Sequence, residues 1–130
     1  MPYDFIIDAK RERELARRLG AAIAQRREKV GLTQEQVSEM LGIGNQAVSR
    51  MERGAVMPTM KRVFEFSGLF QCGADELILA ASDREADQAA VIASVIANVP
   101  PRKRDAFMAI VKQLAELLGG RPVDERPKGG

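Results

Sequence analysis

The chain has 130 residues with a formal net charge of +2; 45% are hydrophobic, 29% are charged and 5% are aromatic, which suits a soluble globular protein of one compact domain with a short appendage. Its single cysteine excludes an internal disulfide, and its lack of histidine excludes a histidine-based catalytic triad and a His/Cys zinc site. No apolar run reaches the ~18 residues needed to span a bilayer, and the first residues lack a signal-peptide core, so we expect a cytoplasmic protein without membrane contact.

The charges are unevenly distributed along the chain. Residues 10–62 contain twelve Lys/Arg and six Glu, a local charge of +6, which leaves −4 for the rest of the sequence. A basic half joined to an acidic half indicates one part that binds a polyanion and another part with a different role.

The first predicted helix covers about residues 8–30. Its apolar residues Leu15, Leu19 and Ile23 recur at helical spacing, with Val30 as a looser fourth, and its other positions are rich in charge. This periodicity is typical of an amphipathic helix with one face in the core.

A second, short helix is expected over the residues TQEQVSEML. Thr33 and Gln36 have the spacing of a capping box, in which each side chain bonds the backbone N–H of the other residue. Gly42 suits the left-handed position that ends many helices. The expected inward residues are Val37, Met40 and Leu41.

A turn of three residues, Gly42-Ile43-Gly44, leads to a third helix at residues 45–53, which Gly54 closes. Two short helices joined by a glycine-containing turn have the helix-turn-helix plan. The residues expected to face inward are Ala47, Val48 and Met51. The polar residues expected to project elsewhere are Asn45, Gln46, Ser49, Arg50 and Arg53.

A fourth and a fifth helix complete the predicted bundle. Pro58 and Thr59 begin the fourth, and the fifth runs from Gly73 to Leu79. The apolar residues available to the core are Met60, Val63, Phe64, Phe66 and Phe70 in the fourth helix and Leu77 and Ile78 in the fifth. Five helices with short connections form a plausible independent bundle.

Two further helices are expected beyond residue 80. Ser82 and Glu85 have capping-box spacing and open a helix to about Asn98, which Pro100-Pro101 break. The next helix, at about 102–118, has an apolar stripe formed by Phe107, Ile110, Val111, Leu114, Leu117 and Leu118. The polar, proline-rich tail at 120–130 is expected to be disordered.

Residues 32–78, LTQEQVSEMLGIGNQAVSRMERGAVMPTMKRVFEFSGLFQCGADELI, contain T-Q, L-G, S-x-x-E and P-T at fixed separations. In this pattern the chain resembles the Cro/phage-repressor (XRE-type) helix-turn-helix family, without a gap over residues 32–78 and over about 10–79 with the first helix. The resemblance implies an all-α fold: a five-helix lambda-repressor-like bundle followed by a C-terminal helical extension.

The resemblance also implies how the third helix is used, since in this family it lies in the DNA major groove. Carried over by position, the residues that contact bases are Asn45, Gln46, Ser49 and Arg50. The residues expected at phosphates are Thr33, Gln34, Arg53, Lys61 and Arg62. An amide can bond adenine bidentately and arginine can do the same to guanine, so these residue types suit base reading.

The resemblance further implies a structural ion pair between Arg27 and Glu52, which would fix the third helix against the first. The chain departs from the family where Gly44 replaces the usual Ser or Thr cap, and where Gln71 and Gly73 replace the usual Gly and Ser. These departures concern local geometry and leave the DNA-facing residues unchanged.

The C-terminal helix pair has more apolar surface than two isolated helices can bury. We favour dimerisation through Phe107, Ile110, Val111, Leu114 and Leu118, because a two-fold operator needs paired reading helices. Packing within the chain and binding of a different protein partner are the alternatives. The expected limits are therefore an N-terminal segment 1–9 (whose Tyr3–Ile7 docks on the body), a DNA-binding domain 10–80, a dimerisation region 81–119 and the tail.

The sequence thus predicts a transcriptional regulator, most simply a dimeric repressor of prokaryotic or phage type that binds double-stranded DNA without metal or cofactor. The first alternative is an antitoxin that regulates its own operon and holds a toxin through its C-terminal helices. The second is a protein-interaction module whose helix-turn-helix has lost DNA binding. The sequence shows no nucleophile–base pair, metal-ligand cluster or phosphate loop, so an enzyme is not expected.

Overall fold

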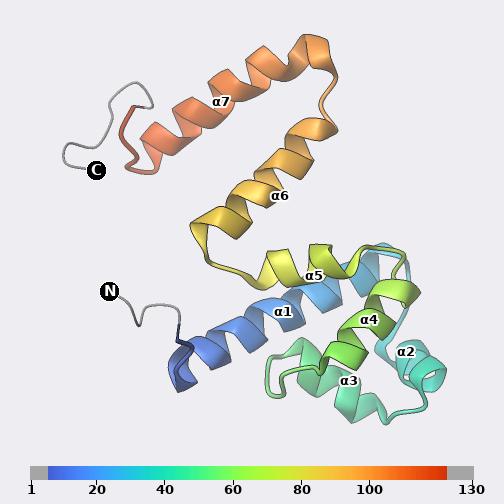
Figure 1. Ribbon diagram of the computed structural model, residues 1–130. Coiled ribbons are helices and arrows are strands. Elements are labelled where there is room, and N and C mark those ends of the chain that lie inside the picture. Colours follow the sequence, from blue (N-terminus) through green and yellow to red (C-terminus); the bar gives the residue numbers. More distant parts are fainter. Residues whose placement is uncertain (1–5, 123–130) are drawn as a thin grey trace. The chain divides into compact units, whose positions relative to one another are not determined.

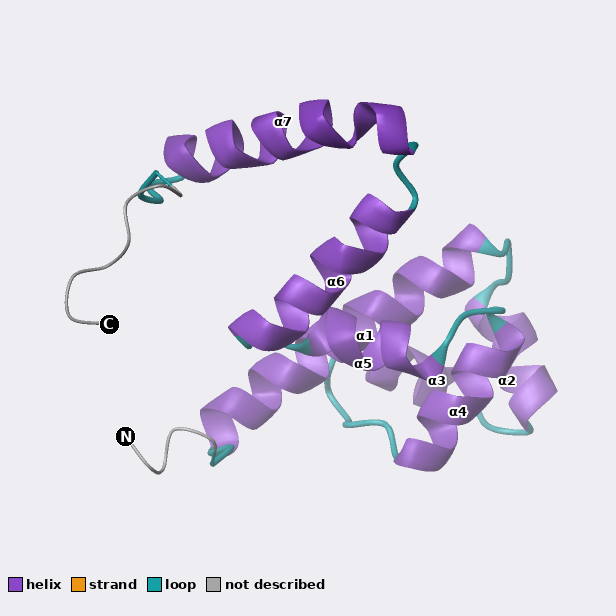
Figure 2. Ribbon diagram, turned by 45° about the horizontal axis from the view of Figure 1, so that its top comes forward, coloured by secondary structure: helices purple, strands orange, loops and turns teal. Residues whose placement is uncertain are grey.

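The structure is a computed structural model that describes residues 6–122, and all regular elements in this range are helices (Figures 1 and 2). They are α1 (Ala9–Lys29), α2 (Gln34–Leu41), α3 (Asn45–Glu52), α4 (Met60–Leu69), α5 (Ala74–Ala81), α6 (Glu85–Ala97), a 3₁₀ turn (Pro101–Lys103) and α7 (Arg104–Leu117). The prediction of an all-α protein is confirmed.

By its contacts the chain divides into a unit that ends at Val91 and a unit that begins at Ile92, so the boundary lies within α6. Each unit is described by itself. No helix in residues 6–122 is both long enough and apolar enough to cross a membrane. The expected domain limits at residues 10–80 and 81–119 remain predictions.

The first unit is built around one hydrophobic core. Its helix α1 contacts α3 and α5, while α2 packs on α3 and α4 packs on α5. The rings of Phe66 and Phe70 stack with centroids 5.6 Å apart in this core. The buried core residues are Leu19, Ala22, Ile23, Val37, Val48, Met51, Val63, Phe66, Phe70, Leu77 and Ala81.

The helix ends of this unit follow from local hydrogen bonding. The predicted capping box is present: the Thr33 hydroxyl accepts from the Gln36 N–H (3.1 Å), and the Gln36 side chain accepts from the Thr33 N–H (2.9 Å). The Thr59 hydroxyl caps α4 by accepting from the Arg62 N–H at 3.2 Å, without a reciprocal bond. Gly42 ends α2 in the left-handed conformation with φ 67°, which glycine adopts at little cost.

Four apolar residues expected in the core from α2, α4 and α5 are exposed instead, and Val30, the looser fourth position of the first helix, is also exposed at 39%. The exposed fractions of the four are 56% for Met40, 59% for Met60, 60% for Phe64 and 43% for Ile78. The reason is the narrow core-facing stripe of a short helix. At 3.6 residues per turn, Phe64 is rotated by roughly 200° from Phe66, so both cannot face the same core.

The expected capping box at Ser82–Glu85 is also wrong. Ser82 ends α5 in an extended conformation, and its N–H donates to the Leu79 carbonyl oxygen. Its hydroxyl accepts from the Arg84 N–H at 3.1 Å and donates to the Asp87 carboxylate at 2.6 Å. Ser82 therefore connects α5 and α6. Its hydroxyl bonds Arg84 and Asp87 rather than Glu85, because α6 begins only at Glu85, three residues after Ser82.

In the second unit, no described residue from Ile92 to Pro122 is buried. Pro101 occupies the first position of the 3₁₀ turn, as expected for a proline that starts a helical segment. The predicted apolar stripe of α7 is largely exposed, with Ile110 at 63%, Leu114 at 53% and Leu118 at 80%. Most of the predicted disordered tail lies outside the described residues.

The docking expected for Tyr3–Ile7 lies mostly outside the described residues as well. The two residues of this segment that the structure describes, Ile6 and Ile7, are 52% and 56% exposed. Helix α1 begins immediately afterwards, where the Asp8 carboxylate accepts from the Arg11 N–H at 2.8 Å.

Candidate nucleic-acid interface

Backbone hydrogen bonds and buried side chains stabilise the turn between α2 and α3. The N–H of Ile43 in the turn donates to the Ser38 carbonyl oxygen at 3.0 Å, and the N–H of Ala47 donates to that of Gly44 at 3.0 Å. Val37 of α2 and Val48 of α3 are both fully buried in the core. A short turn with buried contacts on both sides fixes the angle between α2 and α3.

Helix α3 lies unusually close to the backbone of α1 at two glycines. A Cβ on Gly20 would lie 2.5 Å from the Glu52 carbonyl oxygen and 2.8 Å from its carbonyl carbon. A Cβ on Gly54 would lie 2.5 Å from the Arg17 Cα, and Gly54 also has a left-handed φ of 77°. Only glycine fits at these contacts, so they set how closely the end of α3 approaches α1.

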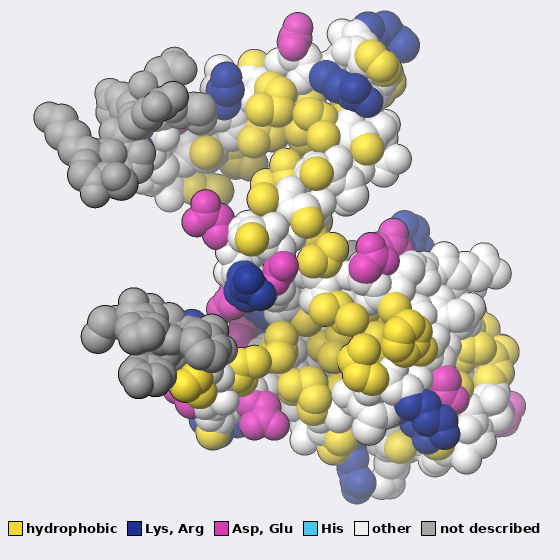
Figure 3. All heavy atoms as spheres, in the orientation of Figure 1, with side chains coloured by type: hydrophobic (Ala, Val, Ile, Leu, Met, Phe, Trp, Pro, Cys, Tyr) yellow, Lys and Arg dark blue, Asp and Glu magenta, His cyan; other side chains and the backbone are white. Residues whose placement is uncertain are grey.

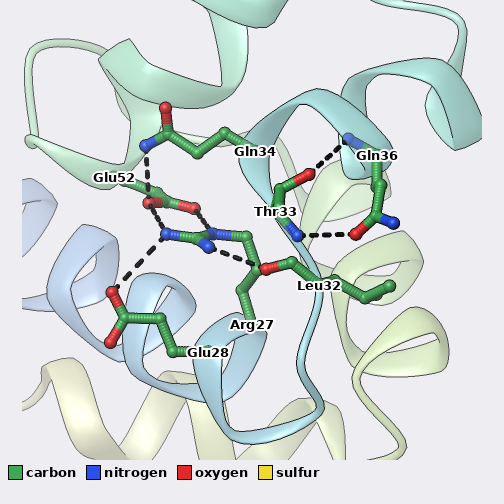
Figure 4. A network of polar contacts seen from close by, with 7 residues as sticks. All are labelled: Arg27, Glu28, Leu32, Thr33, Gln34, Gln36 and Glu52. Carbon is green, nitrogen blue, oxygen red and sulfur yellow. Dashed lines mark hydrogen bonds and ion pairs between the residues drawn. The ribbon is translucent and has the colours of Figure 1, made fainter.

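A nearly buried ion pair adds a polar attachment between the same two helices (Figure 4). Arg27 donates from Nε to Glu52 Oε2 at 2.7 Å and from Nη2 to Glu52 Oε1 at 3.1 Å. The two side chains are only 12% and 5% exposed. Arg27 also donates from Nη1 to the Leu32 carbonyl oxygen at 2.8 Å, which ties in the turn before α2. The expected pairing of Arg27 with Glu52 is therefore present.

The electrostatics of this site favour a charged Arg27. Hydrogen bonding to Glu52 raises the pKa of Arg27, against an opposing effect of desolvation, and the charges of Glu52 and Glu28 add to the rise. A bidentate arginine–carboxylate pair is both strong and directional. The pair therefore fixes the orientation of α3 as well as its distance from α1.

The N-terminus of α2 joins this network through Gln34. Its Nε2 donates to Glu52 Oε1 at 2.9 Å (Figure 4). Gln34 was expected at a DNA phosphate, but its side chain contacts Glu52 within the protein. The side-chain amide of Gln34 has a second N–H that this bond does not use. Thr33, also expected at a phosphate, is exposed, but its backbone N–H and its hydroxyl both take part in the capping box with Gln36. The N–H groups of the first turn that lie outside this box favour anions.

The outward face of α3 carries the predicted base-reading residues. Asn45, Gln46 and Arg50 are exposed, whereas Ser49 is half-buried. The Arg50 guanidinium lies 3.5 Å from Gln46 Oε1, which is the outer limit of a hydrogen bond. Three of the four side chains thus stand free of the protein body on one face of a fixed helix, and Ser49 is closer to it.

The three basic residues expected at phosphates differ in how they are held. Arg53 and Lys61 are exposed. Arg62 is only 24% exposed and makes an ion pair with Glu65 at 2.8 Å on the next turn of α4. Arg62 would therefore have to leave this partner to reach DNA, so its assignment is the weakest of the three.

The sequence did not reveal two features that position the interface, which are the close approach at Gly20 and the contact of Gln34 with Glu52. Gly20 gave a signal, because an isolated glycine inside a helix of 21 residues costs stability and usually has a packing reason. The contact of Gln34 with Glu52 gave none, because the two residues are eighteen positions apart and come from different helices.

Comparison with known families fits this geometry. Residues 23–77 begin within α1 and end within α5, and they match the family model described as Helix-turn-helix. These residues are a Cro/repressor-type helix-turn-helix domain. The family consists of DNA-binding transcriptional regulators and is generally non-enzymatic. No curated protein matches the chain.

Within residues 6–122 the structure contains no group of three or more His, Cys, Asp or Glu side chains arranged to hold a metal ion. The cysteine, Cys72, is half-buried, and desolvation raises the pKa of its thiol, against a smaller opposing effect of the Arg26 charge. A protonated thiol is a poor nucleophile and a poor metal ligand.

Proposed function

We propose that this protein is a sequence-specific transcriptional repressor that reads the DNA major groove with α3 and acts as a dimer on a two-fold operator. The observation that carries the proposal is the two-sided character of α3. One face is fixed by Val48, Met51 and the Arg27–Glu52 pair, and the opposite face presents exposed polar side chains.

In this proposal the exposed side chains of α3 read the bases. Asn45 and Gln46 are suited to adenine and Arg50 to guanine, while the half-buried Ser49 contacts the groove wall at shorter range. Arg53, Lys61 and the N-terminus of α2 contact phosphates, which supply most of the affinity but little of the sequence preference. The basic segment 10–62 strengthens the attraction to DNA.

The proposal assigns dimerisation to the second unit. Exposed apolar side chains on the stripe of α7, such as Ile110 and Leu114, need a surface to cover them, and a second copy provides one. A dimer would place two reading helices on half-sites about one helical turn apart, roughly 34 Å along the DNA.

Fluorescence anisotropy of the full chain against genomic DNA fragments tests the proposal, together with sedimentation to measure the dimer. Arg50→Ala and Gln46→Ala should each lower affinity for the cognate site by about 1–3 kcal/mol and relax the preference at one base position. Arg13→Ala, which removes an exposed arginine of α1, is the matched control and should leave the base preference unchanged.

Two results would count against the proposal. A dimer that shows no preference for any fragment at moderate salt would exclude sequence-specific binding. An equal loss of affinity on all sequences after Arg50→Ala would mean that this side chain contacts only the backbone.

An antitoxin is the second candidate, and the exposed stripe of α7 supports it, because the same surface suits a bound toxin. Co-expression with proteins encoded next to this one separates the two functions. A stable complex that is lost on Leu114→Glu while DNA binding by the first unit persists would favour the antitoxin. A homodimer that excludes such a partner would favour the simple repressor.

A further inference from the structure

Helix α4 presents an apolar stripe on the outside of the first unit. Met60 and Phe64 are 59% and 60% exposed and lie one turn apart, and Gly68 continues the stripe by another turn. Figure 3 shows hydrophobic side chains gathered over this part of the unit. Single exposed apolar residues are ordinary, but two large ones in line with a glycine form a continuous surface.

We propose that this stripe is a self-association surface, through which α4 helices of two copies pack antiparallel around a two-fold axis at Phe64. The inference draws on the proposed dimer for its strength, but it concerns a different surface. It adds a contact between the DNA-binding units themselves, beyond the contact assigned to α7.

The shape of the stripe supports a second copy as the occupant. With Phe64 on the axis, Met60 of one copy lies opposite Gly68 of the other, because both are four residues from the centre. A Cβ built on Gly68 meets nothing within 4 Å, so the backbone there is open to an approaching side chain. A large residue thus faces a small one at both ends of the contact, as in close-packed helices.

The charges beside the stripe select the antiparallel arrangement. Lys61 and Glu65 follow Met60 and Phe64 by one residue each and therefore lie on the same flank of the helix. In an antiparallel pair this flank meets itself in reverse, so Lys61 of each copy comes within reach of Glu65 of the other. The Glu65 carboxylate, which pairs with Arg62 of its own helix through Oε1 at 2.8 Å, would then be shared between the two cations. In a parallel pair this flank would instead face the opposite flank of the other helix, which carries Thr59, Val63 and Ser67, so no pair of opposite charges would form.

The contact is small, and it should be weak when it acts alone. Few large apolar side chains from each copy contribute, which falls far short of the roughly 800 Å² per partner that a stable interface buries. A second link between the copies raises the effective concentration of one surface at the other. Association through α4 therefore becomes significant once α7 or a shared DNA site holds two copies together.

Cross-linking of the full chain in the absence of DNA tests the register. Met60→Cys and Gly68→Cys are made separately in a Cys72→Ser background, mixed, equilibrated and treated with a short bis-maleimide. We expect several-fold more covalent dimer from the mixture than from either variant alone, because like residues lie about 12 Å apart along the axis at 1.5 Å per residue. Met40→Cys, an equally exposed apolar position on α2, mixed with Gly68→Cys is the matched control and should give little dimer.

The charges give a second measurement. Adding Lys61→Glu to both variants should lower the cross-linking yield several-fold, and adding Glu65→Lys as well should restore it. Thermal melts followed by circular dichroism confirm that each variant folds. Restoration is the result that a merely structural role for either residue does not produce.

Four results would overturn the proposal. The first two are a cross-linking yield no higher than that of the Met40→Cys control, and equal yields from the mixture and from the single variants. The third is a strong yield of dimer from Met60→Cys alone. The fourth is protection of Met60→Cys from a monofunctional maleimide, which would mean that the chain itself covers the stripe. If sedimentation still shows a dimer in such a case, the proposed function stands and only the α4 contact fails. A specific cross-link in a protein that sediments as a monomer supports the α4 contact and removes dimerisation through α7.

Discussion

The two units of this protein differ in how far they bury their apolar side chains. The first unit encloses Ile23, Phe66 and Leu77 almost completely, whereas the described part of the second unit buries no residue. A helical bundle with its own core is stable by itself, but a helix whose apolar stripe stays exposed needs another surface. The first unit therefore has a core of its own, and the described part of the second unit has none.

The largest expected effect on the free energy of unfolding comes from comparing the truncation of a core residue with that of an exposed one. Phe66→Ala should lower the free energy of unfolding by about 3–5 kcal/mol at every protein concentration, because it leaves a cavity in a closed core. Leu114→Ala should change the stability only under conditions in which the protein dimerises. Urea denaturation at two protein concentrations measures both, and a concentration-independent loss for Leu114→Ala would contradict the comparison.

A smaller effect compares ion pairs that differ in burial. Glu52→Ala should destabilise the first unit by about 3 kcal/mol, because it leaves Arg27 largely buried without its carboxylate. Glu14→Ala is the matched control, since it removes an exposed pair with Arg17 on the same helix. Chemical denaturation should detect a much smaller loss in this control, because the Glu14 pair is exposed to solvent. Equal losses would mean that the burial of the Arg27–Glu52 pair has no energetic consequence.

The next effect comes from replacing two glycines within helices by alanine, and the two changes in stability should be opposite in sign. Gly20→Ala should destabilise by about 1–3 kcal/mol, because its Cβ overlaps the backbone of Glu52 and pushes α3 away from α1. Gly68→Ala should stabilise α4 by up to ~1 kcal/mol, because it improves helix propensity in open space. Thermal unfolding in dilute, monomeric protein compares them, and stabilisation by Gly20→Ala would show that the close approach is unnecessary.

Much of the first unit was predictable because its signals are local. Glycines and threonines mark the helix ends, so the capping box at Thr33 and the left-handed Gly42 followed directly from the sequence. The exposure of Met60 and Phe64 did not follow, because α4 has apolar residues on more than one face. Which face meets the core depends on the neighbouring helices, and periodicity in a helix of ten residues does not decide it.

The candidate site was predictable in its residue types but not in its connections. The resemblance indicated Arg27 and Glu52, but the Gln34 contact depends on a side chain that crosses from one helix to another. Gln71 was recognised as a departure from glycine, and the structure gives it a left-handed φ of 56°. A non-glycine residue there costs roughly 1–2 kcal/mol, a consequence that becomes visible only once the backbone is known.

The smallest predicted effect concerns pH and the exposed face of α1. Hydrogen bonds from Arg17 lower the pKa of Glu14 from its usual 4.5 to about 2. Desolvation opposes this change, and the charge of Arg17, a hydrogen bond from Arg18 and the charge of Arg18 add to it. Since the folded pKa is the lower one, the stabilisation by this carboxylate is fully present above pH 4.5 and is lost as the pH falls through about 2. The side chain is exposed, so salt should screen the effect and shift the folded pKa back toward 4.5. An NMR titration of the Glu14 carboxyl carbon at low and high ionic strength measures this shift. A midpoint near 4.5 at low salt would mean that the arginines of α1 are solvated separately and remain available to other anions.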